Sequence, residues 1–306
     1  MKAPAFSYLR PQQLHEVLAL LETHGDEARL LAGGQTLLAT LNMRLSEPAL
    51  LIDMQAVSEL KGLSLEGRNL RIGAMVTHTE IETSSLVAQY APLLTAAAPH
   101  IAHRAIRNLG TFGGSIAYGD PAAEWPACLL ALNGVIVVRS LRGERRIAAD
   151  DFFTGLYTTE LAPDEVIVAC DIPVAQANQK ISFSELARRH GDYAVVGLAA
   201  TASLTDSILS DVRLAWIGVG STPMRSFRAE QVLEGQSLSV QTITQAVDML
   251  RSELAPIPDL THSEAAKRQL AGVLLKRALS GWMPSIDTPA NTPNTPLNPS
   301  AQKEPA

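Results

Sequence analysis

Two glycine-rich segments constrain this chain more than any other feature: AGGQT at residues 32–36 and TFGGS at residues 111–115. Each lies between an apolar run and an expected helix or strand. Glycine lets backbone N–H groups approach a bound anion closely, and such groups can converge on phosphate oxygens. Together the segments predict two halves of a cradle for a pyrophosphate group. Either segment taken alone could equally be an ordinary tight turn.

The common nucleotide-binding signatures are missing from both segments. Neither has the G-x-G-x-x-G spacing of a Rossmann pyrophosphate turn. Neither has the P-loop spacing, and no lysine follows either segment. A nucleoside triphosphatase is therefore disfavoured.

Composition describes an ordinary soluble globular protein with core enough for two or three domains. The chain has 306 residues, of which 46% are hydrophobic and 18% charged, with a net charge of -6. No basic patch interleaved with aromatic residues occurs, so nucleic acid is a poor partner. No apolar stretch is long enough to span a bilayer, and the N-terminus has no secretory signal. We expect a cytoplasmic protein without a membrane span.

The residues that usually bind metals are sparse and scattered. Cys128 and Cys170 are far apart and lie in apolar surroundings, which favours buried reduced thiols. Two cysteines cannot ligate an ordinary four-cysteine iron–sulfur cluster. His100 and His103 could share a helix face, and this leaves a metal there as an alternative. We expect no metal site, so that any redox centre on this chain is organic.

Periodicity divides the chain into three blocks that mix helices and strands, and a tail: 1–56, 57–176, 177–283 and 284–306. The first block has a helix whose apolar face carries Leu14, Val17, Leu18 and Leu21. Its strands are expected at 29–32 and 49–53, with a second helix beginning after the first glycine-rich segment. An anion at the N-terminus of that helix would be stabilised by the helix dipole and the free N–H groups.

The remaining blocks mix strands and helices. In the second we expect strands at 69–74 and 165–169, a hairpin of 135–138 with 144–147, and helices over most of 79–102 and over 122–132. The third shows three strand-like runs, at 180–186, 194–204 and 212–219, followed by helices at 228–234, 240–253 and 263–281. The tail is rich in Pro, Thr, Asn and Ser, and this composition predicts disorder.

Four motifs give the chain a specific family resemblance. They are AGGQTLL at 32–38, LRIGAMVTHTEIE at 70–82, RNLGTFGGSIAYGDPAAEWPA at 107–127 and ARRHGDYAVVG at 187–197. In order and spacing they resemble the FAD-binding (medium) subunit of molybdenum hydroxylases, the group of carbon monoxide dehydrogenase and xanthine dehydrogenase. The resemblance implies an α+β fold: a two-lobed, vanillyl-alcohol-oxidase-like (PCMH-type) FAD-binding domain, then a small α+β domain with a three-stranded sheet.

The resemblance also implies which residues bind the cofactor. The two glycine-rich segments would hold the FAD pyrophosphate from opposite sides, and the ARRHGDYAVVG motif would approach the isoalloxazine ring. The implied residues are Ala32, Gly33, Gly34, Gln35, Thr36, Leu37, Thr77, Ile101, Gly110, Thr111, Gly113, Gly114, Ser115, Asp120, Glu124 and Tyr193.

Three of these positions keep an alternative. Relatives often have Asp where this chain has Glu124, and the extra methylene leaves a direct cofactor contact open. Asp120 precedes Pro121 and could merely initiate a turn. Tyr193 could be a core aromatic residue whose hydroxyl bonds to backbone.

The resemblance implies an electron-transfer role. Substrate would be hydroxylated at a molybdopterin centre on a large chain, and electrons would cross two [2Fe–2S] clusters on a small chain to FAD on this one. The complex would be a dimer of heterotrimers, with NAD, a quinone or dioxygen as acceptor. No catalytic side chain is expected here, and the substrate stays open. The alternatives are a self-contained FAD-dependent oxidase or dehydrogenase and, third, a nucleotide-binding regulator without redox chemistry.

Overall fold

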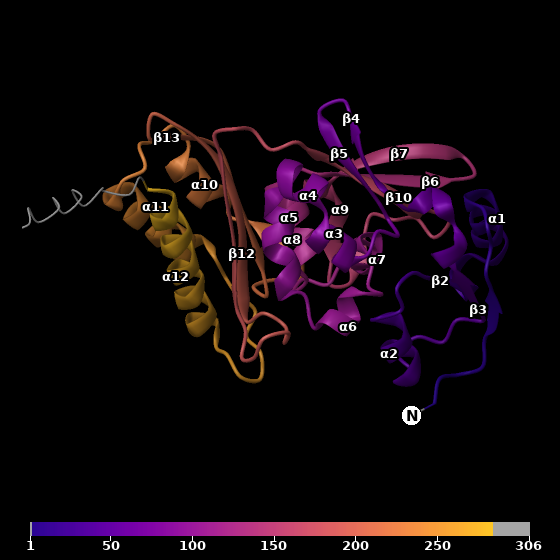
Figure 1. Ribbon diagram of the computed structural model, residues 1–306. Helices are drawn as coiled ribbons and strands as arrows, with labels where there is room; N and C mark the ends of the chain where they lie inside the picture. Colours follow the sequence, from indigo (N-terminus) through magenta and orange to yellow (C-terminus); the bar gives the residue numbers. More distant parts are fainter. Residues whose placement is uncertain (1, 284–306) are drawn as a thin grey trace, which may run out of the picture.

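The computed structural model describes residues 2–283, so the predicted disordered tail lies outside the described residues. The chain runs from an N-terminal lobe through a central body to a C-terminal domain at the opposite end (Figure 1). No helix within this described stretch combines the length and apolar character needed to cross a membrane. The domain boundaries at 56/57 and 176/177 stay a prediction, and each of the three larger sheets lies within one of the blocks.

The N-terminal lobe is built on a parallel sheet in the order β1–β3–β2. Its elements are β1 (Ser7–Leu9), α1 (Leu14–His24), β2 (Ala28–Leu31), α2 (Leu37–Asn42) and β3 (Leu50–Asp53). The four apolar residues predicted to form one face of the first helix are all buried. They share a core with Val137, Val166 and Val168 of the second sheet, so the two lobes pack directly on each other.

The central body contains a five-stranded sheet in the order β4–β5–β10–β6–β7. Its strands are β4 (Leu63–Glu66), β5 (Asn69–Gly73), β6 (Val135–Ser140), β7 (Gly143–Ala148) and β10 (Val166–Pro173), and a separate hairpin joins β8 (Phe153–Gly155) to β9 (Thr158–Thr159). β10 is the central strand and is antiparallel to both neighbours. Its Cys170 is paired with Ile72 on one side and with Ile136 on the other.

Short helices connect these strands. They are α3 (His78–Thr83), α4 (Ser85–Tyr90), α5 (Pro92–Ala97), α6 (Arg104–Arg107), α7 (Phe112–Tyr118), α8 (Glu124–Ala131) and α9 (Ala149–Phe152). Single 3-10 turns occupy Gly25–Glu27, Met54–Ala56, Ser58–Leu60 and Ala98–His100. In α8, every residue after Glu124 is buried. An apolar surface all round is typical of a helix enclosed by other elements, and α8 contacts the C-terminal sheet as well as α5 and α7.

The C-terminal domain has a four-stranded antiparallel sheet, which corrects the three strands expected from sequence. Its elements are β11 (Gln179–Leu186), β12 (Val196–Thr205), β13 (Ile208–Ile217), β14 (Met224–Arg225), α10 (Phe227–Leu233), α11 (Val240–Glu253) and α12 (Glu264–Trp282). The extra strand, β14, is only two residues long and pairs with β13. Two residues are too few to show the alternation that identifies a strand in a sequence. The three helices lie on the outer side of the sheet, facing away from the central body (Figure 1).

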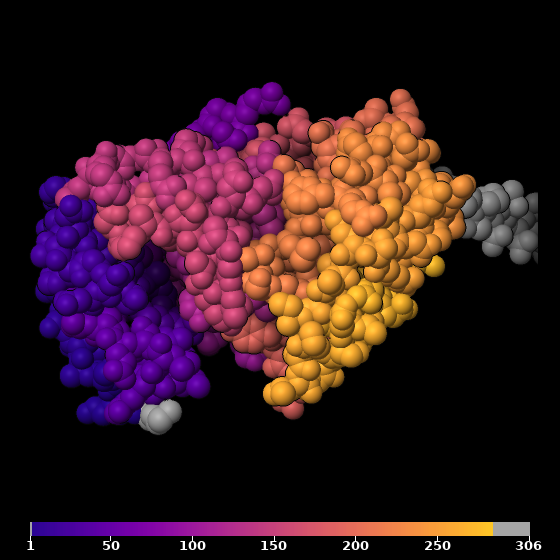
Figure 2. Space-filling view, turned by 180° about the vertical axis from the view of Figure 1, so that it is seen from behind, coloured from indigo at the N-terminus to yellow at the C-terminus, as the bar shows by residue number. Residues whose placement is uncertain are grey.

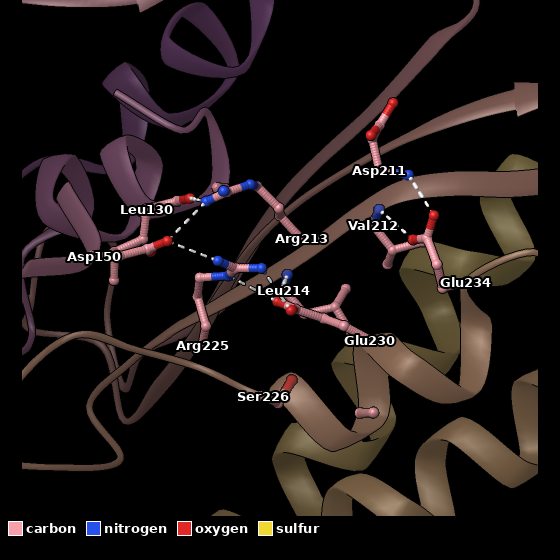
Figure 3. A network of polar contacts seen from close by, with 12 residues as sticks. Leu130, Asp150, Asp211, Val212, Arg213, Leu214, Arg225, Ser226, Glu230 and Glu234 are labelled. Atoms are coloured by element: carbon pink, nitrogen blue, oxygen red, sulfur yellow. Dashed lines mark hydrogen bonds and ion pairs between the residues drawn. The ribbon is translucent and has the colours of Figure 1, made fainter. Parts of the chain in front are cut away.

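A polar network fastens this domain to the central body (Figure 3). Arg213 of β13 donates from Nη1 to the carbonyl oxygen of Leu130 at 2.9 Å. Arg225 of β14 donates from Nη1 to Asp150 Oδ2 at 2.8 Å and from Nη2 to Glu230 Oε2 at 2.7 Å. The two arginines therefore link α8 and α9 to the sheet and to α10.

Candidate functional site

A cavity of about 640 Å³ lies where the N-terminal lobe, the central body and the start of the C-terminal domain meet. Its volume falls within the range of about 300–1,000 Å³ that is usual for small-molecule sites. The space-filling view shows a notch along the lower edge of the molecule, between the indigo–purple N-terminal part and the yellow C-terminal helices (Figure 2).

Nearly all the residues implied by the family resemblance line this one cavity, although they come from distant parts of the sequence. The lining residues among them are Ala32, Gly33, Gly34, Gln35, Thr36, Leu37, Ile101, Gly110, Thr111, Gly113, Gly114, Ser115, Asp120, Glu124 and Tyr193. Thr77 is not one of them. Its hydroxyl instead caps α3, where it accepts from the backbone N–H of Glu80 at 3.2 Å.

The first glycine-rich segment connects β2 to α2 and offers unused backbone donors. Gly34 has φ +72, in the left-handed region that glycine adopts without strain. Within residues 2–283, no acceptor is found for the backbone N–H groups of residues 33–37. Consecutive free N–H groups at the start of a helix are suited to binding an anion.

The second glycine-rich segment is wound into a helix, with Thr111 as the N-cap of α7. The N–H groups of Phe112 and Gly113 donate to the carbonyl oxygens of Val76 and Ala74, at 2.8 and 2.9 Å. Those of Gly114 and Ser115 donate to the side chain and the carbonyl oxygen of Thr111. These four N–H groups are therefore committed within the protein, contrary to the expectation that both segments would present backbone donors.

Glycines in both segments stand at close contacts that leave no room for a side chain. A Cβ on Gly33 would lie 2.1 Å from the carbonyl oxygen of Leu109, and one on Gly113 would lie 2.5 Å from the Cβ of Ala74. A Cβ on Gly114 would lie 2.8 Å from Thr111 Oγ1. The contact of Gly33 with Leu109 joins the first segment to the residues just before the second, and both segments line one cavity.

Two carboxyl groups line the wall after the second segment: Asp120, which is buried, and Glu124, which is half-buried. Asp120 accepts a hydrogen bond from the N–H of Ala122 at 2.9 Å, which is the turn considered from the sequence, and it lines the cavity as well. Burial raises its pKa above the ordinary value. Burial also raises the pKa of Glu124 to about 8, with a smaller contribution from the charge of Glu185. The raised pKa favours the protonated form of Glu124, which can donate a hydrogen bond.

Tyr193 lies at the edge of the cavity, on the connection between β11 and β12, and is 72% exposed. The alternative that it is a core aromatic residue is therefore wrong.

Two further tyrosines line the cavity and were not found from the sequence: Tyr118 of α7 and Tyr157 between β8 and β9. Their ring centroids are 5.0 Å apart. No local pattern marks Tyr157, because the hairpin that carries it is very short.

His78 also lines the cavity and is not among the residues implied by the family resemblance. It is buried, and its Nδ1 accepts a hydrogen bond from the indole N–H of Trp125 at 2.9 Å. His78 lies within the motif LRIGAMVTHTEIE. Its partner Trp125 is 47 residues away, so the sequence does not reveal their hydrogen bond.

Metal ligands are not gathered anywhere in residues 2–283: no group of three or more His, Cys, Asp and Glu side chains is arranged to hold an ion. Cys128 and Cys170 are both buried free thiols. Burial raises the pKa of each thiol, so both stay protonated and unreactive.

Comparison with known proteins identifies the family. The model described as "FAD binding domain in molybdopterin dehydrogenase" matches residues 4–175, and "CO dehydrogenase flavoprotein C-terminal domain" matches residues 181–281. The chain is 42% identical to the nicotine 6-hydroxylase medium subunit of Paenarthrobacter nicotinovorans over 279 residues, which are 91% of this chain and 98% of that one. The chain belongs to the FAD-binding medium subunits of the molybdenum hydroxylases.

Solved structures agree with this family. The carbon monoxide dehydrogenase of Hydrogenophaga pseudoflava matches with a TM-score of 0.89 and 36% identity, over 92% of this chain and 98% of that one. Quinoline 2-oxidoreductase of Pseudomonas putida 86 matches with a TM-score of 0.87 and 37% identity, over the same shares of the two chains. The family resemblance seen in the four sequence motifs is thereby confirmed.

Proposed function

We propose that this chain holds FAD in the cavity between its lobes and serves as the electron-transfer subunit of a molybdenum hydroxylase. It receives electrons from [2Fe–2S] clusters on a small partner chain and passes them to an external acceptor. The large partner chain carries the molybdopterin cofactor and the substrate. One observation carries the proposal: two glycine-rich segments from different lobes line one cavity.

The residues of the cavity fit a dinucleotide. The first segment supplies free N–H groups at residues 33–37, which suit the charged pyrophosphate. Ser115 and Thr36 add hydroxyl groups on the two sides. Glu124 supplies an acidic proton, and Tyr193 supplies an aromatic surface at the edge. Thr77 remains a weaker candidate, because its hydroxyl is committed to the helix cap.

The cofactor and the protein residues have different roles in this proposal. Bound FAD would supply the redox chemistry, since a flavin can exchange electrons singly or in pairs. The protein residues bind it, orient it and shield it from water. We assign no catalytic side chain and no metal ligand to this chain.

The relatives support a role that does not depend on substrate. Matching medium chains and subunits carry names that refer to nicotine, carbon monoxide, glyceraldehyde and xanthine. Chains this similar serve complexes named for very different substrates, which supports placing substrate chemistry on a partner. We propose a dimer of heterotrimers in the cytoplasm, where two free thiols stay reduced.

Reconstitution tests the proposal. The purified chain should bind one FAD whose absorbance bleaches on reduction, and it should hydroxylate nothing alone. Adding the large and small partner chains should restore substrate-dependent reduction of NAD, a quinone or dioxygen. Turnover of an organic substrate by the isolated chain at an ordinary rate, about 1–1,000 per second, would instead establish a self-contained flavin oxidoreductase.

A further inference from the structure

His78 packs against Gly110, which lies between α6 and the second glycine-rich segment. It is 6% exposed and is the first residue of α3. Its backbone N–H donates to the carbonyl oxygen of Gly110 at 3.0 Å. A Cβ on Gly110 would lie 2.7 Å from His78 Nε2, so the imidazole ring fills the space that the glycine leaves. Since both residues line the cavity, Nε2 is held at its wall.

Trp125 fixes which nitrogen of the ring carries the proton. Its indole N–H, fully buried in α8, donates to His78 Nδ1 at 2.9 Å. An indole nitrogen can only donate, so Nδ1 must present its lone pair. A neutral imidazole then carries its hydrogen on Nε2. Burial, and to a lesser extent the charge of Arg107, lowers the pKa of His78 to about 4, so the ring is neutral at physiological pH.

The Nε2–H group has no acceptor among residues 2–283. The backbone N–H groups of residues 112–115 already have acceptors within the protein. A ligand on this side of the cavity would therefore depend on a side-chain donor. Nε2 is not among the fully buried polar atoms without a partner, so it is accessible from the cavity and open to an acceptor atom of a ligand.

We propose that His78 donates an Nε2–H hydrogen bond to an acceptor oxygen of the FAD sugar–phosphate chain, and that Trp125 is the positioning residue that holds His78 in this tautomer. The inference rests on the proposed binding of FAD. It adds a side-chain donor on the wall where the backbone N–H groups of residues 112–115 are committed within the protein.

Two substitutions separate the donor from the packing. In His78→Asn the side chain can still accept from Trp125, but it is too short to place a donor where Nε2 lies. In His78→Gln the amide nitrogen can reach that position. We expect FAD to dissociate from the Asn variant with a dissociation constant roughly 3- to 10-fold higher, as for the loss of one hydrogen bond. The Gln variant should stay within about twofold of the wild type.

The measurement is quenching of FAD fluorescence by the full-length apoprotein. Unchanged affinity in His78→Asn, or equal weakening in both variants, would overturn the proposal. Binding of riboflavin by the same proteins locates the acceptor: a loss seen with FAD alone assigns a phosphate oxygen, and a loss seen with both assigns the ribityl chain. If the wild type binds no FAD at all, the proposed function fails, whatever the role of His78.

A nitrogen-15 spectrum of the apoprotein tests the tautomer without any cofactor. We expect His78 to be neutral with its hydrogen on Nε2, and Trp125→Phe to introduce the Nδ1–H form. A wild-type spectrum with the hydrogen on Nδ1, or a charged ring at pH 7, would overturn the proposal even if the Asn variant failed to fold.

Discussion

Gly33 and Leu109 are in backbone contact, so close that a Cβ on the glycine would lie 2.1 Å from the leucine carbonyl oxygen. The contact joins the first lobe to the segment that leads into α7. We expect Gly33→Ala to force the two apart, lowering the free energy of unfolding by about 1–3 kcal/mol, as for overpacking, and reducing the FAD retained on purification. Urea unfolding and the ratio of flavin to protein absorbance would measure both effects.

Gly281→Ala is the matched control for that substitution. A Cβ on this glycine in α12 meets nothing within 4 Å, and its φ is not positive. Alanine there should leave flavin content unchanged and, if anything, raise stability by about 0.5–1 kcal/mol. Similar flavin loss in both variants would show that the contact with Leu109 is not what matters.

Tyr193 should affect the flavin without affecting the fold. Because its side chain is 72% exposed, truncation to Ala should change the free energy of unfolding by less than about 0.5 kcal/mol. A buried aromatic residue would cost about 3–5 kcal/mol. We expect Tyr193→Ala to shift the absorbance or reduction potential of bound FAD and Tyr193→Phe to shift it less. An unchanged spectrum and potential in the Ala variant would contradict contact with the flavin.

Glu124 should make stability depend on pH. Its pKa is about 8 in the folded chain against an ordinary value of 4.5, so the folded state holds this proton more tightly than the unfolded state. As the pH rises from about 4.5 to about 8, Glu124 therefore lowers the free energy of unfolding progressively. Above about pH 8 it causes no further change in that free energy. In the apoprotein, Glu124→Gln should lose less stability than the wild type between pH 5 and pH 8.

Urea unfolding at several pH values measures this difference, and Glu47→Gln is the exposed control. The control should follow the wild-type curve. If Glu124→Gln also follows it, Glu124 does not hold its proton in the folded chain.

Arg225 should hold the C-terminal domain to the central body. Its guanidinium pairs with Asp150 and with Glu230, which is 5% exposed. Arg225→Ala would leave the buried Glu230 carboxylate without its cation, at a cost of about 3–5 kcal/mol. Thermal unfolding should show a large fall in melting temperature, whereas Arg228→Ala, on the exposed side of α10, should show little change. Equal falls would mean that the network of Figure 3 does not stabilise the domain.

The local features of the fold were predictable from the sequence. The spacing of Leu14, Val17, Leu18 and Leu21 is a property of one helix, and the structure buries all four. The hairpin of β6 and β7 also follows from neighbouring residues. The convergence of both glycine-rich segments was predicted because four motifs in a fixed order resemble a known family.

Features set by distant partners were not predictable. The N–H groups of Phe112 and Gly113 are committed to Val76 and Ala74, more than thirty residues earlier, so the second segment could not be distinguished from a free anion-binding turn. The tautomer of His78 depends on Trp125, which no spacing rule connects to it. The β14 strand forms only because β13 is beside it.

The central place of β10 governs when this protein can become competent to take up its cofactor. Arg71 of β5 is hydrogen-bonded to Asp171 of β10, 100 residues later in the chain. During synthesis, β5 and β6 therefore cannot pair with β10 until that strand has been made. The part of the cavity wall formed by Val166 and Ile167 is also missing until then. Contacts of such long range slow folding. FAD should consequently load only after the ribosome has passed residue 173, and nascent chains stalled earlier should remain colourless.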